Sequence, residues 1–116
     1  MANNPSRSHP RVTTEISAKV RLPGGRSIIA GHIRNISLGG VFIALKEPPA
    51  FGADLDLEFS VPAGGQVIRC KGFVVWSTKS NPEKAPGLQG IGVRLTDIGV
   101  QEMRLLSDFI KTQLDD

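Results

Sequence analysis

Strict alternation of apolar and polar residues in two segments constrains the fold of this chain more than any other feature. In residues 54–61 the apolar positions are Leu55, Leu57, Phe59 and Val61, separated by Asp54, Asp56, Glu58 and Ser60. Residues 15–22 alternate in the same way, with Ile16, Ala18, Val20 and Leu22 as the apolar set. Successive side chains of a β-strand point to opposite faces, so this period of two predicts strands with one buried face.

Turn signals separate these strands from four others, which we predict at residues 28–35, 41–45, 67–76 and 90–95. The chain has 13 Gly and 8 Pro, and such a density of turn formers favours short strands over long helices. In the segment 67–76 the period of two predicts an inward set of Ile68, Cys70, Gly72, Val74 and Trp76. Arg69 and Lys71 then face outward, where they can pair with the acidic face of residues 54–60.

The period changes after Asp97. Met103, Leu106, Ile110 and Leu114 are spaced by three or four residues, which predicts an amphipathic helix at about 98–114 with Asp97 as its N-cap. We expect this helix to cover an open end of the sheet. Six short strands followed by one helix indicate an all-β fold with a terminal helix, either a small antiparallel barrel or a strongly curled sheet.

Residues 1–14 differ from the rest of the chain. They are polar, contain Pro5 and Pro10, and have almost nothing to bury, so we expect a flexible basic N-terminal arm, followed by one globular domain at 15–116. No apolar run is long enough for a membrane span, and no apolar segment of a secretory signal is present, so we expect a cytoplasmic protein. The single cysteine, Cys70, is expected to be a small buried side chain.

Catalysis is not expected. His9 and His32 lie in an arm and in a predicted strand, with no nucleophile motif, Walker loop or paired carboxylates beside them, and no Cys–His cluster has metal-site spacing. The sequence therefore predicts neither an enzyme nor a metal site. An excess of three positive charges is only a mild bias toward anionic ligands.

Two polar motifs have the chemistry of an anion site. Arg7 and Arg11 are four residues apart on the arm, and guanidinium groups pair with phosphate, bind the O6 and N7 edge of guanine, and stack on bases. The second motif, at residues 35–40, is the run NISLGG. In it Asn35 and Ser37 offer hydrogen-bonding groups, and Gly39 and Gly40 let a ligand approach the backbone.

In this order, RxxxR followed by [D/N]xSxxG resembles the signature of the PilZ domain family. The segments RSHPRV, NISLGGVFI and GIGVRL, the last followed by a helix, look like the entry, the second-to-third strand junction and the end of that fold. The resemblance covers essentially the whole chain. It implies a stand-alone protein with a six-stranded antiparallel barrel, a C-terminal helix and no attached output domain.

The same resemblance implies binding of the bacterial second messenger cyclic di-GMP, with no other cofactor. Its expected ligand residues are Arg7, Arg11, Asn35, Ser37, Gly39 and Gly40. For Trp76 two placements stay open. Similar domains can place an aromatic residue against the ligand, yet the strand period puts Trp76 on the core side. Two departures are Ser6, where a further Arg often stands, and Asn35, where Asp is commoner; both leave affinity and ligand stoichiometry undetermined.

The resulting hypothesis is a receptor whose arm becomes ordered on cyclic di-GMP and creates a surface for an effector protein. One alternative is a PilZ-like adaptor that binds no nucleotide and acts through protein contacts alone. A further alternative is a small nucleic-acid-binding barrel. Five Phe and one Trp, with the Phe residues mostly in buried phase, disfavour nucleic acid because stacking platforms are few.

Overall fold

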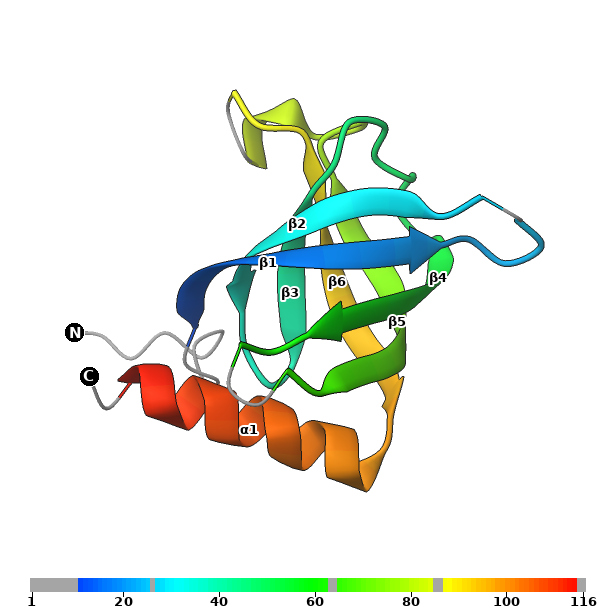
Figure 1. Cartoon of the computed structure of the whole chain (residues 1–116). Helices are drawn as coiled ribbons and strands as arrows, with labels where there is room; N and C mark the ends of the chain where they lie inside the picture. The colour runs from blue at the N-terminus through cyan, green and yellow to red at the C-terminus, as the bar shows by residue number, and fades with distance from the viewer. Residues whose placement is uncertain (1–10, 26, 63–64, 85–86, 115–116) are drawn as a thin grey trace.

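The chain forms a closed antiparallel barrel of six strands with one helix across its end (Figure 1). The computed structural model describes residues 11–25, 27–62, 65–84 and 87–114. The elements are β1 (Val12–Arg21), β2 (Ile29–Ile36), β3 (Gly40–Ala44), β4 (Asp54–Ser60), β5 (Val67–Ser77), a short 3-10 helix η2 (Pro82–Lys84), β6 (Gly90–Ile98) and α1 (Val100–Leu114). The order around the barrel is β1-β2-β3-β6-β5-β4, and β4 pairs again with β1. The predicted barrel with a terminal helix is confirmed.

The core lies inside the barrel and is made by the inward side of each strand. Val20, Ile33, Ile43, Leu57 and Ile68 are all at most 2% exposed. Alternation along β1 and β4 matches the period of two in the sequence, because the other face of these strands meets solvent.

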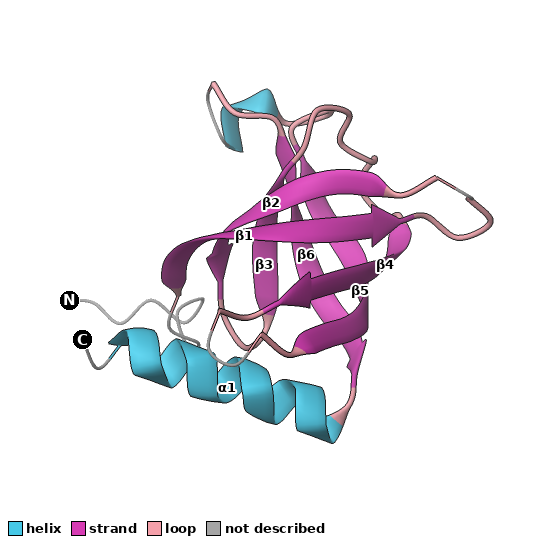
Figure 2. Cartoon of the chain, in the orientation of Figure 1, coloured by secondary structure: helices cyan, strands magenta, loops and turns pink. Residues whose placement is uncertain are grey.

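Helix α1 lies across the lower end of the barrel (Figure 2). Its buried residues are Leu106, Phe109 and Ile110, which join the same apolar cluster as the strands. The opposite side of the helix is polar, and Val100 and Leu114 at its two ends are exposed. The helix therefore closes the core where the strands alone would leave it open to water.

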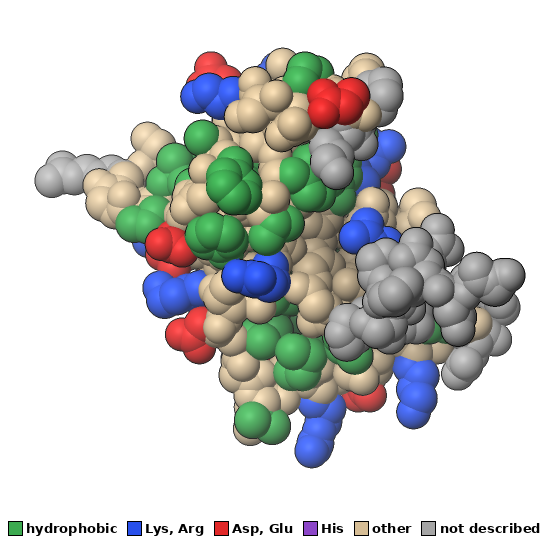
Figure 3. Space-filling view, turned by 180° about the vertical axis from the view of Figure 1, so that it is seen from behind, with side chains coloured by type: hydrophobic (Ala, Val, Ile, Leu, Met, Phe, Trp, Pro, Cys, Tyr) green, Lys and Arg blue, Asp and Glu red, His purple; other side chains and the backbone are tan. Residues whose placement is uncertain are grey.

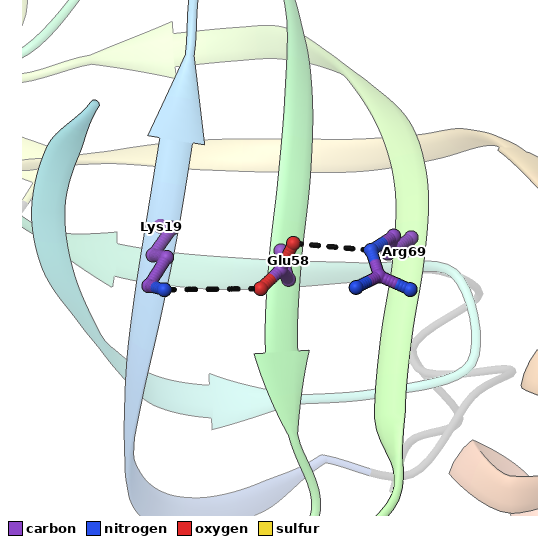
Figure 4. Close-up of polar contacts among 3 residues, drawn as sticks. All are labelled: Lys19, Glu58 and Arg69. Atoms are coloured by element: carbon purple, nitrogen blue, oxygen red, sulfur yellow. Dashed lines mark hydrogen bonds and ion pairs between the residues drawn. The ribbon is translucent and has the colours of Figure 1, made fainter. Parts of the chain in front are cut away.

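Charged side chains on the outer face of β1, β4 and β5 pair across the strands, as expected for the acidic face of β4. Glu58 accepts from Arg69 at 3.1 Å and lies 4.0 Å from the Lys19 ammonium (Figure 4). Lys71 donates to Asp56 at 2.8 Å. These groups are well exposed, so the pairs contribute little to stability, and their main effect is to favour this strand register.

Two predicted boundaries are wrong. Strand β1 begins at Val12, three residues before the expected start of the domain, because Val12 is buried in the core and pairs with Ile36. Asp97 is not the N-cap of α1: it continues β6, opposite Lys71, and the helix begins at Val100, where the Met103 N–H donates to the Gly99 carbonyl. No helix in the described ranges is long and apolar enough to cross a membrane.

Truncating Leu106 will test whether α1 closes the core. Leu106 is completely buried, so Leu106→Ala should lower the free energy of unfolding by about 2–5 kcal/mol, through lost apolar contact and the cavity left behind. Urea titration followed by circular dichroism measures this change. The matched variant Val100→Ala, at an 80% exposed position of the same helix, should change stability by less than about 0.5 kcal/mol. Equal effects of the two variants would contradict the role given to α1.

Cys70 provides a second test of the core. Burial raises the pKa of its thiol to about 11, and the nearby Glu102 and Asp97 carboxylates act in the same direction. Only the thiolate attacks disulfide reagents, so native protein at pH 8 should react with 5,5′-dithiobis(2-nitrobenzoate) far more slowly than protein unfolded in urea. Absorbance of the released thionitrobenzoate measures both rates. Rapid reaction of the folded protein would show that Cys70 is accessible.

Candidate ligand-binding face

Two β-bulges decide which side chains the barrel presents on the face formed by β2, β3, β6 and β5. In β2 the register shifts between Ile33 and Asn35, so Arg34 is the extra residue opposite β3. In β5 it shifts between Val74 and Trp76, with Val75 as the extra residue. A bulge inserts one residue and so reverses the side to which every later side chain points.

The bulge in β5 settles the position of Trp76. Val74 and Ser77 are buried inside the barrel, and Trp76 lies outside it, half-buried. Trp76 packs on Gly92 of β6 and stacks on Phe42 of β3, with ring centroids 5.3 Å apart and an interplanar angle of 13°. The placement of Trp76 in the inward set of its strand is therefore wrong, because the period of two does not continue through the bulge.

The bulge in β2 has the same consequence for Asn35. Ile33 and Ile36 are both completely buried, and Asn35 lies on the outer face between them in the sequence. Across the sheet Asn35 pairs with Phe42, Phe42 with Gly92, and Gly92 with Trp76. One row across four strands thus brings the amide of Asn35 and the indole of Trp76 to the same surface.

The two sequence motifs meet at this surface. The Arg11 guanidinium donates a hydrogen bond from Nη1 to Oδ1 of Asn35, at 3.2 Å, although these residues are 24 positions apart. Pairing of β1 with β2 brings them together, since Thr13 is directly opposite Asn35. Arg7 and His9 lie outside the described residues. Of the predicted arginine pair, the structure therefore places Arg11 beside Asn35.

Ser37 and Gly40 shape the turn that follows Asn35. Ser37 is buried, and its Oγ accepts hydrogen bonds from the N–H groups of Gly39 and Gly40, at 3.3 and 3.2 Å. The Ser37 N–H in turn donates to the Gly40 carbonyl at 2.8 Å. The Ser37 hydroxyl therefore stabilises the turn, and its own contacts are with the backbone of the turn.

Gly40 and Gly39 are held against β6. A Cβ on Gly40 would lie 2.5 Å from the carbonyl oxygen of Val93, so no other residue fits here without moving a strand. The Gly39 carbonyl accepts from the Leu95 N–H at 3.1 Å. The backbones of both glycines therefore line this surface.

Phe42 and Gly92 complete the row, and neither was predicted from the sequence as part of a site. Phe42 reads as another core residue of an apolar strand. Gly92 lies inside the strand predicted at 90–95, where an isolated glycine is a signal that another group packs closely on the backbone. Of the five Phe residues, Phe42, Phe59 and Phe109 are buried, as the sequence predicts, although Phe42 packs on Trp76 and not in the core cluster. Phe51 is 62% exposed, and Phe73 is half-buried on the outer face. His32 is exposed on β2, and within the described ranges no cluster of His, Cys, Asp and Glu could hold a metal ion.

A family model of the PilZ domain matches residues 5–112. The chain belongs to the PilZ domain family. This confirms the resemblance carried by the two motifs and agrees with the closed barrel and its terminal helix. A search of curated protein sequences finds no match to this PilZ chain.

Solved structures show the same fold at low sequence identity. The Inhibitor of motility of Bacillus subtilis (MotI/DgrA) matches 95% of this chain with a TM-score of 0.74 and 18% identity, and this chain spans about half of it, 52%. The PilZ domain of YcgR from Escherichia coli, solved with c-di-GMP, has a TM-score of 0.71 and 14% identity, covering 94% of this chain and 92% of that one. The PilZ domain of CeSA from a cellulose-synthesizing bacterium has a TM-score of 0.58 and 15% identity, covering 90% and 95%.

Removing the Ser37 hydroxyl will test its role in the turn. Ser37→Ala leaves the partly buried N–H groups of Gly39 and Gly40 without that acceptor, so the free energy of unfolding should fall by about 0.5–1.5 kcal/mol. Urea denaturation measures the loss, and Ser60→Ala, at an exposed end of β4, serves as the control with little expected change. Unchanged stability of Ser37→Ala would mean that the hydroxyl does not hold the turn.

Proposed function

We propose that this PilZ domain is a receptor for cyclic di-GMP, which it binds on the face that carries Arg11, Asn35 and Trp76. The observation that most supports the proposal is the hydrogen bond between Arg11 and Asn35, which joins the two halves of the motif on one surface. Membership of the PilZ family and the fold shared with the YcgR domain that was solved with c-di-GMP point the same way.

The chemistry of this face suits a ligand with phosphates and flat bases. Arg11 carries a planar cation that can pair bidentately with a phosphate or with a guanine edge. Asn35 offers an amide for a base edge, and its Oδ1 already accepts from Arg11, so its Nδ2 donors remain for an acceptor on the ligand. Trp76 offers an aromatic plane whose other side is backed by Phe42.

The remaining motif residues have separate proposed roles. The turn beside Asn35 is kept in its conformation by Ser37, Gly39 and Gly40. These residues therefore affect ligand binding mainly by maintaining the shape of this surface. Arg7 would supply a second guanidinium from the arm.

Signalling is proposed to depend on residues 1–10 of the arm. Ordering costs about 1–2 kcal/mol per fixed residue, and charge-assisted hydrogen bonds to the ligand, each about 1.5–3 kcal/mol, must offset it. An arm ordered over the barrel would present a new surface to an effector protein. In this scheme the protein is a cytoplasmic receptor and adaptor with no catalytic activity of its own.

Isothermal titration calorimetry with cyclic di-GMP, with GTP as the control nucleotide, tests the proposal. Arg11→Ala should weaken binding by about tenfold or more, since one charge-assisted contact is lost and 1.4 kcal/mol corresponds to a factor of ten. Arg104→Ala, an exposed site on α1, is the matched control and should bind as the wild type does. Trp76 is the only tryptophan, so its fluorescence should change on titration. Wild-type affinity in Arg11→Ala would overturn the role of Arg11.

A second candidate is an adaptor that binds no nucleotide. It is favoured by the same hydrogen bond, because Arg11 and Asn35 satisfy each other without any ligand. Amide NMR signals of residues 35–40 separate the two: shifts on titration with micromolar cyclic di-GMP support the receptor, and unmoved signals support the adaptor.

A further inference from the structure

A second surface, distinct from the ligand row, lies on the outside of the barrel near the start of β4. Phe51, Phe73 and Val75 form it, and we call these three residues the aromatic patch. Phe51 is 62% exposed and Val75 is 37% exposed. The rings of Phe51 and Phe73 meet edge to face, with centroids 6.3 Å apart. None of the three belongs to the core cluster, so the fold does not need their apolar surface.

Exposed aromatic side chains that pack on each other outside the core point to a binding surface. In the view from behind, hydrophobic side chains gather on the upper part of this side of the barrel, with Lys or Arg side chains at their border (Figure 3). The other exposed large apolar residues are Ile28, Val67, Val100 and Leu114. Ile28, Val100 and Leu114 come from other parts of the chain, and Val67 lies at the opposite end of β5 from Val75, whereas Phe51 and Phe73 are joined by their ring contact.

Charges of opposite sign flank the patch. In the strand register Arg94 of β6 is opposite Phe73 on one side, and Asp54 of β4 is opposite Phe73 on the other. The Arg94 guanidinium carbon lies 5.5 Å from the centre of the Phe73 ring. Each of the two charges is therefore about one strand spacing, roughly 5 Å, from the line of β5.

Neither flanking charge has a partner in the ion pairs found among the described residues. Those pairs join Lys19 and Arg69 to Glu58, and Lys71 to Asp56. The exposed Lys19, Arg69 and Lys71 are thus paired within the chain, whereas Arg94 and Asp54, which are also exposed, take part in none of these pairs. Across the patch a positive side chain, the apolar side chains and a negative side chain therefore follow one another.

We propose that the aromatic patch is the contact between two copies of this chain, related by a two-fold axis that runs along β5 at Phe73. Such an axis exchanges the two sides of β5, so it places Arg94 of each copy over Asp54 of the other. The aromatic side chains then meet their own symmetry mates at the centre. An interface of this kind is self-complementary, as a two-fold dimer requires.

A second copy fits this patch better than an unrelated partner, because each chain carries both the cation, Arg94, and the carboxylate, Asp54, that the two ion pairs need. A partner that met only Arg94 would need a carboxylate there and would leave Asp54 without a cation. The proposal does not rest on the proposed function.

Sedimentation velocity over a range of protein concentrations tests the dimer. The wild type should shift from monomer to dimer as concentration rises. Arg94→Glu and Asp54→Arg should each raise the dimer dissociation constant by about tenfold or more, because each single reversal places two like-charged pairs across the interface. An equimolar mixture of the two variants should associate again, since both pairs in the mixed dimer are then of opposite sign.

The control is the pair Arg104→Glu and Asp108→Arg, which makes the same changes of charge on the exposed side of α1 and should leave association unaltered. Phe51→Ser should abolish the dimer without changing the melting temperature, because Phe51 lies outside the core. A wild type that stays monomeric at every concentration overturns the proposal, and so does a dimer that neither charge reversal weakens. Cyclic di-GMP calorimetry on the same samples reports separately on the proposed function.

Discussion

Closure of six strands around one apolar interior is the constraint on which the rest of this structure depends. Each strand can direct only one face inward, and the interior accepts little besides Val, Ile, Leu, Phe and small residues. Closure also leaves no free sheet edge within the barrel. Polar chemistry is therefore confined to the outer face and the turns, and helix α1 is needed where the strands end.

Departures from regular strand geometry create the candidate ligand surface. Without the bulge at Arg34, Asn35 would point into the core and Ile36 would face water; without the bulge at Val75, Trp76 would exchange places with Ser77. Each bulge disrupts the ladder locally, and each directs one side chain of the candidate ligand surface outward. Because both bulges act on the same row of the sheet, the amide and the indole end on one surface.

The motif at residues 35–40 has one side chain that faces outward and other groups that support the turn. Asn35 faces outward and contacts Arg11, whereas the Ser37 hydroxyl and the Gly40 backbone are engaged with the chain itself. Substitutions at these positions should therefore have different consequences. A change at Asn35 affects hydrogen bonding at the surface, and a change at Ser37 or Gly40 affects the shape and stability of the turn.

The sequence by itself determined the strands, the helix and the PilZ motifs, because burial on one face imposes a period of two on β1 and β4 and a period near 3.6 on α1. The cross-strand ion pairs of β4 and β5 followed from the same period. The direction of Trp76, the support from Phe42 and Gly92, and the meeting of Arg11 with Asn35 were decided only by the tertiary structure. A strict period of two makes no allowance for the extra residue of a bulge, and a contact between residues 24 positions apart exists only once β1 and β2 are paired.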